Sequence, residues 1–551
     1  MASSAEPPDF ASRLRRTTQF LRPSHQHSAL SATLLLMSAI MLSRVIGYLR
    51  EAYIAWAFGA GHATDAYVAA FTLPDWLNYM VAGGAASITF ISIFTRYTAE
   101  GREEEANRAF SIVITLMTAV LTAGIVLAEI FCPQIERVMF PKFSPEELKL
   151  CVYLTRILLP AQLFFYVGGV VSAVLLSRRM FLFPALGPLF YNLFIILGGV
   201  TLSWKLGIAS LAIGAVAGGF VGPFLINAIG AGRAGMRYRP AFDFRHPAFL
   251  EWVRLSIPLM LGVTLVAADE WILRYFASGG TGDITRLNYA KRLFAVPIAV
   301  LGQATGQASL PFFARLFGEK RLQEFASTVS NAVYRVSAAS FLAAAWMAAA
   351  ALPIVDLVYR RGRFQFADSQ ATAVFFFWFA LSLALWSAQG LYARGFYAAG
   401  DTLTPMVAGT IITLASLPVY SWFFRTFEVT GLAVASDIGI LANTVALAWL
   451  LHRKRLAPFS VMKWGELGKA LLTAIFAGLA AYGVTRSIVL NGSRGADLKA
   501  LGLVTLTWAA AVAVGLMVTR SELPGQLRRR LAATPPEPPP ESRETRELFR
   551  P

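Results

Sequence analysis

Long apolar runs separated by short polar connections fill most of this 551-residue chain. A helix needs about 20 apolar residues to cross about 30 Å of hydrocarbon. Fourteen runs of that length lie near 31–57, 66–95, 109–131, 151–177, 181–203, 207–231, 250–277, 287–314, 327–352, 367–393, 403–424, 429–451, 467–487 and 499–519. They are continuous rather than alternating, which predicts helices and not β-barrel strands. We therefore predict an all-α integral membrane protein with about 14 transmembrane helices.

Two short motifs recur in the same order in the two halves of the chain. FGAGHATD at 58–65 returns as FASGGTGD at 276–283, and GAASITF at 84–90 returns as GQASLPF at 306–312. Both copies open a block of six spans, and an even number of spans gives both blocks the same orientation. This pattern predicts two pseudo-symmetric six-helix lobes around a central cavity. The predicted division is a basic tail at 1–29, an N-lobe at 30–247, a C-lobe at 248–455, a final helix pair at 456–521 and a disordered tail at 522–551.

The composition agrees with a membrane protein and limits the partners it can have. Charged residues make up 15% of the chain, against roughly 25% in soluble proteins. The 49 Lys and Arg exceed the 32 Asp and Glu, for a net charge of +17. Charge this sparse argues against a nucleic-acid partner. The loops and tails on the side of the membrane that holds both chain ends carry roughly twice as many Lys and Arg as the loops on the opposite side. Cytoplasmic loops carry the excess of positive charge in membrane proteins, so this predicts cytoplasmic termini. The loop with Arg360, Arg361 and Arg363, on the opposite side, does not follow this rule.

Signals of catalysis, metal or cofactor binding are missing from the sequence. The five His are scattered without the spacing of metal ligands, and there is no phosphate-binding GxxxxGK[ST] loop. We therefore predict no enzyme activity, no metal and no cofactor. Cys132 and Cys151 flank one outer loop, where a disulfide is the alternative to the two free thiols that we favour.

Ionisable side chains inside predicted spans are costly in lipid, so each one calls for a partner or a cavity. They are Arg44, Arg50 and Glu51 in the first run, Asp269 and Glu270 in the seventh, and Lys291 and Arg292 in the eighth. The four cations come from the leading hairpins of both lobes, where a central cleft would lie. Arginine binds phosphate oxygens bidentately and stays charged when desolvated. The pattern therefore favours a cleft for an anionic substrate.

Structural explanations compete with this one at each position. Arg44 could extend to the cytoplasmic headgroups, and Arg50 with Glu51 could be an ion pair between helices. Asp65 and Asp283 could cap helices at the outer surface, which we favour for Asp283. Interfacial anchoring is the prediction for Arg156, Arg254, Arg274, Arg335, Arg394 and Lys469, which lie near span ends.

Three stretches carry a resemblance to a known family. SRVIGYLREAYIAWAFGAGHATDAYVAAFTLP at 43–74 strongly resembles the opening signature of the MurJ/MviN family, the bacterial lipid II flippases. NYAKRLFAVPIAVLGQATGQASLPFF at 288–313 and ARGFYAAGDTLTP at 393–405 resemble two further signatures. The likeness extends over about 30–520. The family belongs to the multidrug/oligosaccharidyl-lipid/polysaccharide exporter superfamily and has two six-helix lobes plus two C-terminal helices.

The resemblance implies a function in the bacterial inner membrane. It implies a flippase that moves lipid II, the undecaprenyl-pyrophosphate-linked peptidoglycan precursor, from the cytoplasmic to the periplasmic leaflet. By motif position, Arg44, Arg50 and Arg292 would hold the pyrophosphate, with Glu51 and Asp65 as associated acidic residues. The helices at 467–487 and 499–519 would form a groove for the lipid tail. Cell-wall synthesis machinery is the implied protein partner.

The chain departs from the family pattern at several positions. Asn78 stands where relatives often carry an arginine, Gly83 replaces an acidic residue, and Lys291 replaces an aspartate. Asn78 and Lys291 join the candidate substrate-binding residues. Leu273, Ser416 and Tyr420 fall at the sodium-binding positions of some members, so we do not predict sodium coupling.

Other functions therefore stay open. The substrate could be another polyprenyl-linked oligosaccharide. A drug exporter would favour an acidic cavity, a non-transporting cell-wall scaffold would have no cavity and fully paired arginines, and a membrane enzyme would need a catalytic constellation.

Overall fold

The structure, a computed structural model, describes residues 29–79, 90, 93–98, 100–178, 180–261, 265–490 and 493–525. These residues form helices and no β-strand, which confirms the all-α prediction. Within them, nine helices are long and apolar enough to cross a membrane, or ten if the bent pair Phe366–Leu381 and Leu383–Ala398 is one span. The count of fourteen spans stays a prediction. Gly83 and most of the 84–90 motif lie outside the described residues.

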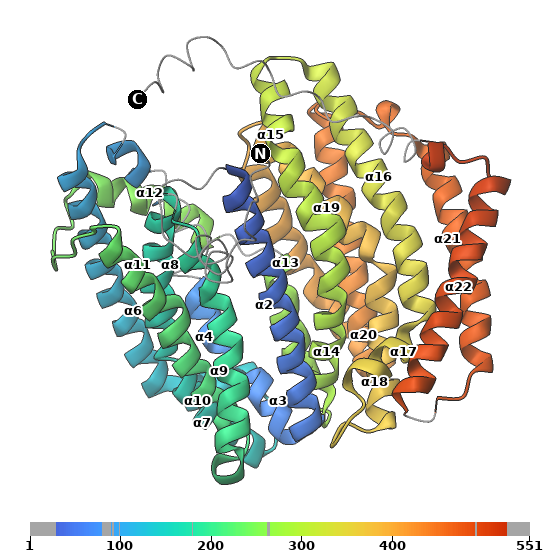
Figure 1. Ribbon diagram of the computed structural model, residues 1–551, viewed down its shortest axis with the longest axis horizontal. Coiled ribbons are helices and arrows are strands. Elements are labelled where there is room, and N and C mark those ends of the chain that lie inside the picture. Colours follow the sequence, from blue (N-terminus) through green and yellow to red (C-terminus); the bar gives the residue numbers. More distant parts are fainter. Residues whose placement is uncertain are drawn as a thin grey trace, which may run out of the picture.

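The first half of the chain forms one helical body, here called the N-lobe (blue to green in Figure 1). Its helices are α2 (Ala29–Phe58), α3 (His62–Ala69), α4 (Thr72–Leu77), α6 (Glu103–Met139), α7 (Pro145–Leu158), α8 (Ala161–Ser177), α9 (Leu182–Leu206), α10 (Ala209–Gly219), η2 (Phe220–Ile226) and α11 (Asn227–Arg233). Helices α9 and α10 pack with their backbones almost touching. A Cβ added to Gly214 would come within 2.5 Å of the Phe194 carbonyl oxygen, so only glycine permits this approach.

The second half forms the C-lobe and a peripheral helix pair (Figure 1). Its helices are α12 (Pro247–Leu261), α13 (Leu265–Ala277), α14 (Asp283–Pro297), η3 (Ile298–Ala304), α15 (Thr305–Gly318), α16 (Leu322–Ala349), α17 (Ala351–Tyr359), α18 (Phe366–Leu381), α19 (Leu383–Ala398), α20 (Leu403–Arg453), η4 (Phe459–Val461), α21 (Trp464–Ser487) and α22 (Arg494–Val518). Helix α20 breaks at Phe427 and Glu428, where Glu428 has a φ of 51°. The break separates the predicted runs 403–424 and 429–451.

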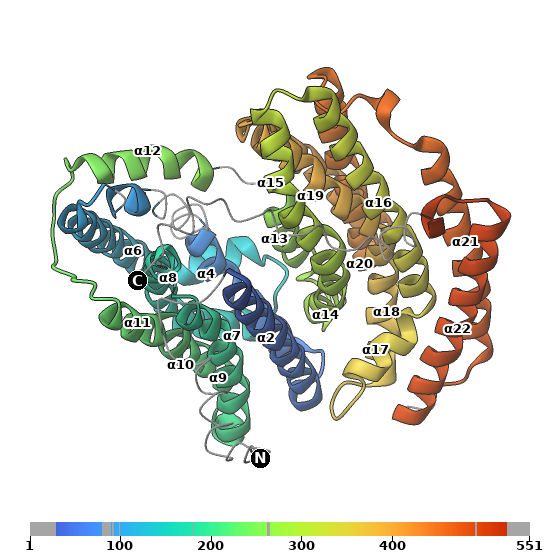
Figure 2. The same cartoon turned by 45° about the horizontal axis from the view of Figure 1, so that its top comes forward.

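Helix α12 lies across one end of the N-lobe (Figure 2), although the predicted division counts residues from 248 onward with the C-lobe. Its buried Phe249 and Trp252 belong to the N-lobe core. Arg96 and Glu251 add an ion pair at 2.5 Å. The helix therefore follows the N-lobe in its packing and connects the two lobes in sequence.

The helix pair α21 and α22 stands at the outer edge of the C-lobe (Figure 1). Trp346 of α16 donates from its indole nitrogen to the Thr505 hydroxyl at 2.9 Å, and Trp508 donates to the Leu342 carbonyl at 3.0 Å. These bonds, which satisfy both indole N–H groups within an apolar contact, hold the pair against α16.

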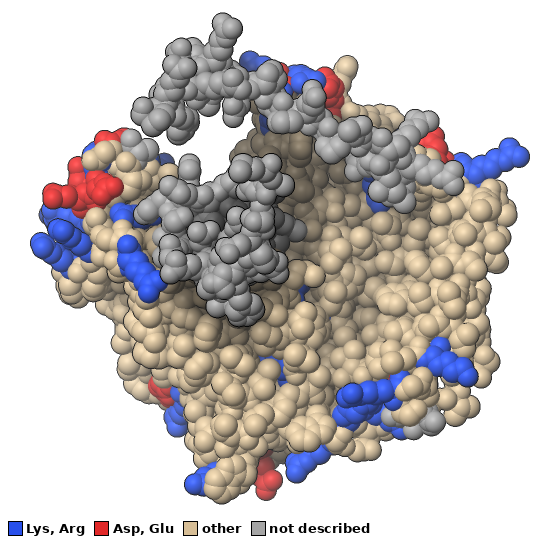
Figure 3. Space-filling view, in the orientation of Figure 1, with Lys and Arg blue, Asp and Glu red and all other residues tan. Residues whose placement is uncertain are grey.

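The lobes meet along α2 and α3 on one side and α14 and α17 on the other. We call the end of the molecule where α2 begins the Ala29 side, and the opposite end, where α2 turns into α3, the Gly61 side (Figure 1). Charged side chains gather towards these two ends, and a broad band between them is almost free of charge (Figure 3). Such a band is what a bilayer core requires of the surface that faces it.

The two cysteines are buried and free. The Cys151 thiol donates to a Glu136 carboxylate oxygen at 3.4 Å. The disulfide alternative is therefore not realised, in agreement with the favoured prediction.

Candidate functional site

A cavity of about 230 Å³ lies between the lobes. Helices α2, α3, α4 and α9 of the N-lobe line it, together with α13 and α14 of the C-lobe. Its charged lining residues are Arg50, Glu51, Asp75, Arg274 and Arg292. Arg274 lies against two carboxylates, Asp75 and Glu270, whereas Arg50 and Arg292 share Glu51, so the local excess of positive charge lies at that pair. Charges in such a position are the usual mark of a binding site in a membrane protein.

The centre of the cavity is a carboxylate held between two guanidinium groups. Glu51 pairs with Arg50 of the same helix, and its Oε1 atom lies 3.8 Å from Nε of Arg292 on the opposite lobe. Asn192 of α9 accepts a hydrogen bond from Arg50 at 2.8 Å, which fixes the direction of that side chain. The Arg292 side chain keeps 44% of its surface exposed. Two arginines thus share one acidic partner, and one of them remains open to a ligand.

The Tyr48 hydroxyl joins the lobes beside this group. It donates to the Arg292 main-chain carbonyl at 3.0 Å, so α2 and α14 touch at the level of the charges. Of the four cations that the sequence predicts in one cleft, Arg50 and Arg292 line this cavity, and Arg44 and Lys291 do not. The ion-pair alternative for Arg50 and Glu51 agrees with this geometry as well, because Glu51 serves both arginines.

Arg274 is a site residue that the sequence reasoning missed. The prediction of an interfacial anchor is wrong for it, because only 8% of its side chain is exposed. Its guanidinium donates to Thr72 at 3.0 Å and lies 3.7 Å from Asp75, both in the N-lobe, and 3.4 Å from Glu270 on its own helix. The available signal was the Glu270–Arg274 spacing of four residues, which places both on one helical face.

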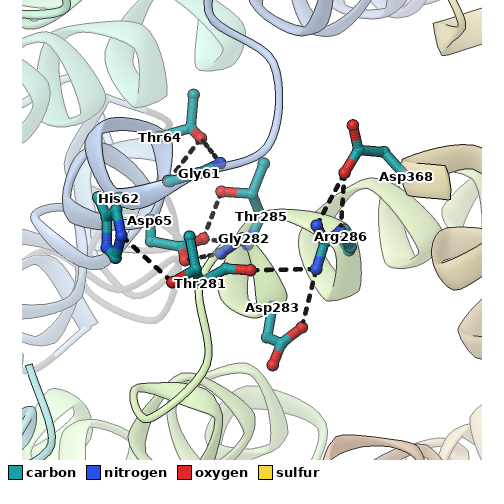
Figure 4. A network of polar contacts seen from close by, with 10 residues as sticks. All are labelled: Gly61, His62, Thr64, Asp65, Thr281, Gly282, Asp283, Thr285, Arg286 and Asp368. Carbon is teal, nitrogen blue, oxygen red and sulfur yellow. Dashed lines mark hydrogen bonds and ion pairs between the residues drawn. The ribbon is translucent and has the colours of Figure 1, made fainter. Parts of the chain in front are cut away.

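Asp65 caps a helix of the opposite lobe (Figure 4). Gly282 immediately precedes α14 as its N-cap, with a φ of 81°, and has no side chain to accept from the first free N–H groups. The Asp65 carboxylate takes that place, accepting from the Gly282 N–H at 2.5 Å, the Thr285 N–H at 2.8 Å and the Thr285 hydroxyl at 2.6 Å. A carboxylate at a helix N-terminus also gains from the helix dipole. Asp65 therefore ties the lobes together on the Gly61 side.

The two copies of the recurring motif meet at this point. Asp65 ends the first copy and Gly282 belongs to the second. Beside them, His62 contacts the Thr281 hydroxyl at 3.2 Å (Figure 4). Arg286 completes the network through Asp283 at 3.1 Å and Asp368 at 2.8 Å. The internal repeat thus supplies both halves of the contact that closes the Gly61 side.

His62 gives the N-lobe a pH-dependent contact. Its other ring nitrogen pairs with Glu147 of α7 at 2.5 Å, and this hydrogen bond raises the pKa of His62 above its ordinary value. The ion pair therefore contributes its stability below about pH 6.5 and loses it as the pH rises through the raised pKa. We expect His62→Gln to lower the melting temperature at pH 5.5 and to match the unchanged protein at pH 8.5. Equal shifts at both pH values would contradict this prediction.

Lys291 lies outside the lining of the central cavity. Its ammonium group pairs with buried Asp269, which also accepts from the Tyr420 hydroxyl, inside the C-lobe. The rings of Phe379 and Trp386 lie 5.4 and 5.9 Å from it. Its charge is therefore balanced locally, and it does not add to the cationic cavity as Arg292 does.

Arg44 and Asn78 also lie outside that lining. Arg44 is exposed on α2, one turn before Tyr48, and pairs with no acidic residue in the described part of the chain. Asn78 follows the last residue of α4, beyond the Asp75 that lines the cavity.

Two helical lobes around a shared, cation-lined cavity define a membrane transporter of the two-lobed class. Solved structures with this fold include one described as a lipid II flippase MurJ in an inward closed conformation. It has a TM-score of 0.74 at 21% identity and covers 88% of this chain and 99% of its own. An inward-facing multidrug resistance transporter of the MOP superfamily has a TM-score of 0.61 at 15% identity, over 76% of this chain and 98% of its own.

Sequence comparison identifies the family. The profile of the family described as lipid II flippase MurJ matches residues 54–498. The lipid II flippase MurJ of Burkholderia cenocepacia is 28% identical over 75% of this chain and 82% of its own length. A probable lipid II flippase MurJ of Synechocystis is 26% identical over 81% of this chain and 85% of its own. The chain belongs to the lipid II flippase MurJ family, a family of multi-pass membrane transporters rather than of enzymes.

Proposed function

We propose that this protein moves lipid II from the cytoplasmic to the periplasmic leaflet by alternating access, with the pyrophosphate held in the central cavity. The observation that carries the proposal is the shared carboxylate: Arg50 and Arg292, from opposite lobes, meet at Glu51 alone. A pyrophosphate offers several oxygens to the same two guanidinium groups. It would replace Glu51 as their partner and balance the charge that these two arginines carry beyond their one shared carboxylate.

Substrate binding would shift the conformational equilibrium in which the two lobes move relative to each other. Arg50 lies on α2 and Arg292 on α14, so an anion bound to both pulls the lobes towards each other. A ligand shifts a conformational equilibrium by its difference in affinity for the two states. Bidentate hydrogen bonds from both arginines form only when both reach the phosphates. They therefore supply the difference in affinity between the two states.

The contacts on the Gly61 side support entry of the substrate from the opposite, Ala29 side. Asp65, His62 and Arg363 all contact the opposite lobe there, Arg363 through its N–H to the Trp56 carbonyl at 3.0 Å. The proposed orientation follows the excess of Lys and Arg in loops on the Ala29 side, which places that side and both termini in the cytoplasm. The cavity would then receive the headgroup from the cytoplasmic leaflet. Exposed Arg44, on the Ala29 side of the cavity, would meet the phosphates first.

An apolar groove on the C-lobe is suited to the polyprenyl tail. It has a volume of about 400 Å³ and lies between α16, α18 and α21. Small residues form part of its lining, among them Ala344, Ala345, Ala348, Ala474 and Gly478. Small side chains leave room for a branched hydrocarbon chain while the headgroup occupies the polar cavity. The predicted tail groove at 467–487 and 499–519 is therefore proposed between the first of these helices and α16.

Filling the groove tests the role proposed for it. We expect Ala345→Trp to reduce lipid II flipping about tenfold, because the indole would occupy space needed by the tail while leaving the cavity arginines in place. Leu506→Trp is the matched control, since Leu506 is 70% exposed on α22 and does not line the groove. Transport by both variants is compared in proteoliposomes. Equal activity of the two variants would contradict the assignment.

Complementation of a strain depleted of its own lipid II flippase tests the function as a whole. Rescue by this chain, together with lipid II becoming accessible on the outer leaflet, supports the proposal. A carrier of another polyprenyl-linked oligosaccharide would use the same arginines but would not rescue. A scaffold that recruits cell-wall synthesis machinery would rescue even without Arg50 and Arg292.

A further inference from the structure

A second polar cavity, of about 340 Å³, lies within the C-lobe between α13, α14, η3, α18 and α19. Its polar lining residues are Glu270, Lys291, Gln303, Gln389 and Arg394. The charges of two of these are already balanced, Lys291 by Asp269 and Glu270 by Arg274 at 3.4 Å. Arg394 is the charged group on this wall that remains to be explained.

Arg394 occupies a space that two glycines keep free. A Cβ on Gly306 would come within 2.6 Å of its guanidinium carbon, and a Cβ on Gly390 within 3.3 Å of its Nη1 atom. Any larger residue at position 306 would displace the guanidinium. This half-buried side chain donates one hydrogen bond, to the Gly390 carbonyl at 2.8 Å, and forms no ion pair with any residue that the structure describes. A guanidinium has five N–H donors, so most of its hydrogen-bonding capacity is available to a ligand.

A third, smaller cavity lies between this one and the central one along α14. Asn288 lines both the central cavity and this smaller one, which shares Lys291 and Glu270 with the C-lobe cavity. Arg292 and Gln303 lie eleven residues apart along α14 and η3, which is at most about 16 Å along the helix axis. An extended peptide of five residues spans about 17 Å. A headgroup anchored at Arg292 could therefore extend a peptide of that length to Gln303, which lines the same cavity as Arg394.

We propose that Arg394, flanked by Gln303 and Gln389, binds a carboxylate of the peptide that the lipid II headgroup carries. The inference rests on the proposed function and adds a second anchoring point to it. A single guanidinium group between two neutral amides suits a carboxylate, which carries one negative charge. The pyrophosphate carries more charge and suits the two arginines of the central cavity. The amides can donate to peptide carbonyls and accept from peptide N–H groups. Arg394, predicted from the sequence to be an interfacial anchor, becomes a substrate-specificity residue.

Binding of two lipids to the purified full-length protein separates this role from the pyrophosphate site. The probes are lipid II and undecaprenyl pyrophosphate, which shares the tail and the phosphates but lacks sugars and peptide. We expect Arg394→Gln to weaken lipid II binding about tenfold and to leave undecaprenyl pyrophosphate binding unchanged. Arg394→Lys should fall between, because it keeps the charge and loses the fork. Arg315→Gln, which removes an exposed arginine of α15, is the matched control.

The outcomes distinguish the inference from the proposed function. If Arg394→Gln leaves lipid II binding unchanged, or weakens both lipids equally, the peptide subsite is wrong. If lipid II with an amidated peptide, free of carboxylates, binds as tightly as lipid II itself, a carboxylate is not what Arg394 recognises. If Arg292→Ala weakens neither lipid, the proposed pyrophosphate site fails, whatever Arg394 does.

Discussion

Replacing Arg292 by alanine is expected to abolish complementation of a flippase-depleted strain and to lower lipid II flipping in proteoliposomes at least tenfold. The hydrogen bonds of a charged group to a ligand are worth about 1.5–3 kcal/mol, which corresponds to about 10–100-fold in affinity. Of the two central arginines, Arg292 gives the variant that is easier to interpret. Its removal leaves Glu51 paired with Arg50, so no buried charge loses its last partner.

Two companion variants separate substrate binding from folding. Arg292→Lys keeps the charge but loses the bidentate fork, so we expect partial activity. Arg50→Ala should also abolish transport, but it leaves Glu51 with the more distant guanidinium and removes the donor to the Asn192 amide oxygen, so it will cost stability as well. Surface expression and melting temperature show which effect dominates. Full activity of Arg292→Ala in a folded protein would rule out the proposed phosphate site.

Replacing Asp65 by alanine is expected to open the Gly61 side and to stop transport. The variant leaves two main-chain N–H groups at the start of α14 without their acceptor, and each such loss costs about 1–3 kcal/mol in the closed state. A shift of about 3 kcal/mol changes the ratio of closed to open molecules more than a hundredfold. The protein would then rest open towards the Gly61 side and receive little substrate from the other face.

Thiol labelling measures this shift directly. Val68 lines the central cavity and is buried in the closed state, so Val68→Cys reports access from the Gly61 side to an impermeant maleimide. Labelling should be slow with Asp65 in place and fast in the Asp65→Ala background. Asp65→Asn keeps the shape and one carbonyl acceptor, and we expect an intermediate rate. Identical labelling with and without Asp65 would show that its hydrogen bonds do not hold this side closed.

The internal repeat explains how the contact that closes the Gly61 side is formed. Each copy of the motif brings the chain from one long helix into the next, from α2 to α3 and from α13 to α14. These two turns contact each other between the lobes. One copy supplies the carboxylate of Asp65 and the other the free N–H groups of the Gly282 turn. A single duplicated segment thus makes a contact that neither lobe could make alone.

Much of the fold could be predicted from the chain alone. Runs of about 20 apolar residues specify helices in lipid because nothing else satisfies the backbone there. The recurrence of FGAGHATD predicted two lobes. The placing of Arg44, Arg50, Lys291 and Arg292 in the leading hairpins predicted one shared cleft, and two of the four, Arg50 and Arg292, line the cavity. These inferences depend on the hydropathy of each segment and on the order of the motifs along the chain, and both can be read directly from the sequence.

The sequence also determined that the first helices carry more charge than lipid tolerates, and therefore that a polar interior exists. Only the tertiary structure decided which charges face it. Lys291 and Arg292 are neighbours on one helix and point about 100° apart, so one turns into the C-lobe towards Asp269 and the other towards Glu51. Asp65 finds its partners 217 and 220 residues away. Contacts of that kind depend on how the two lobes pack against each other. The residues next to a side chain in sequence do not indicate which surface of the other lobe will contact it.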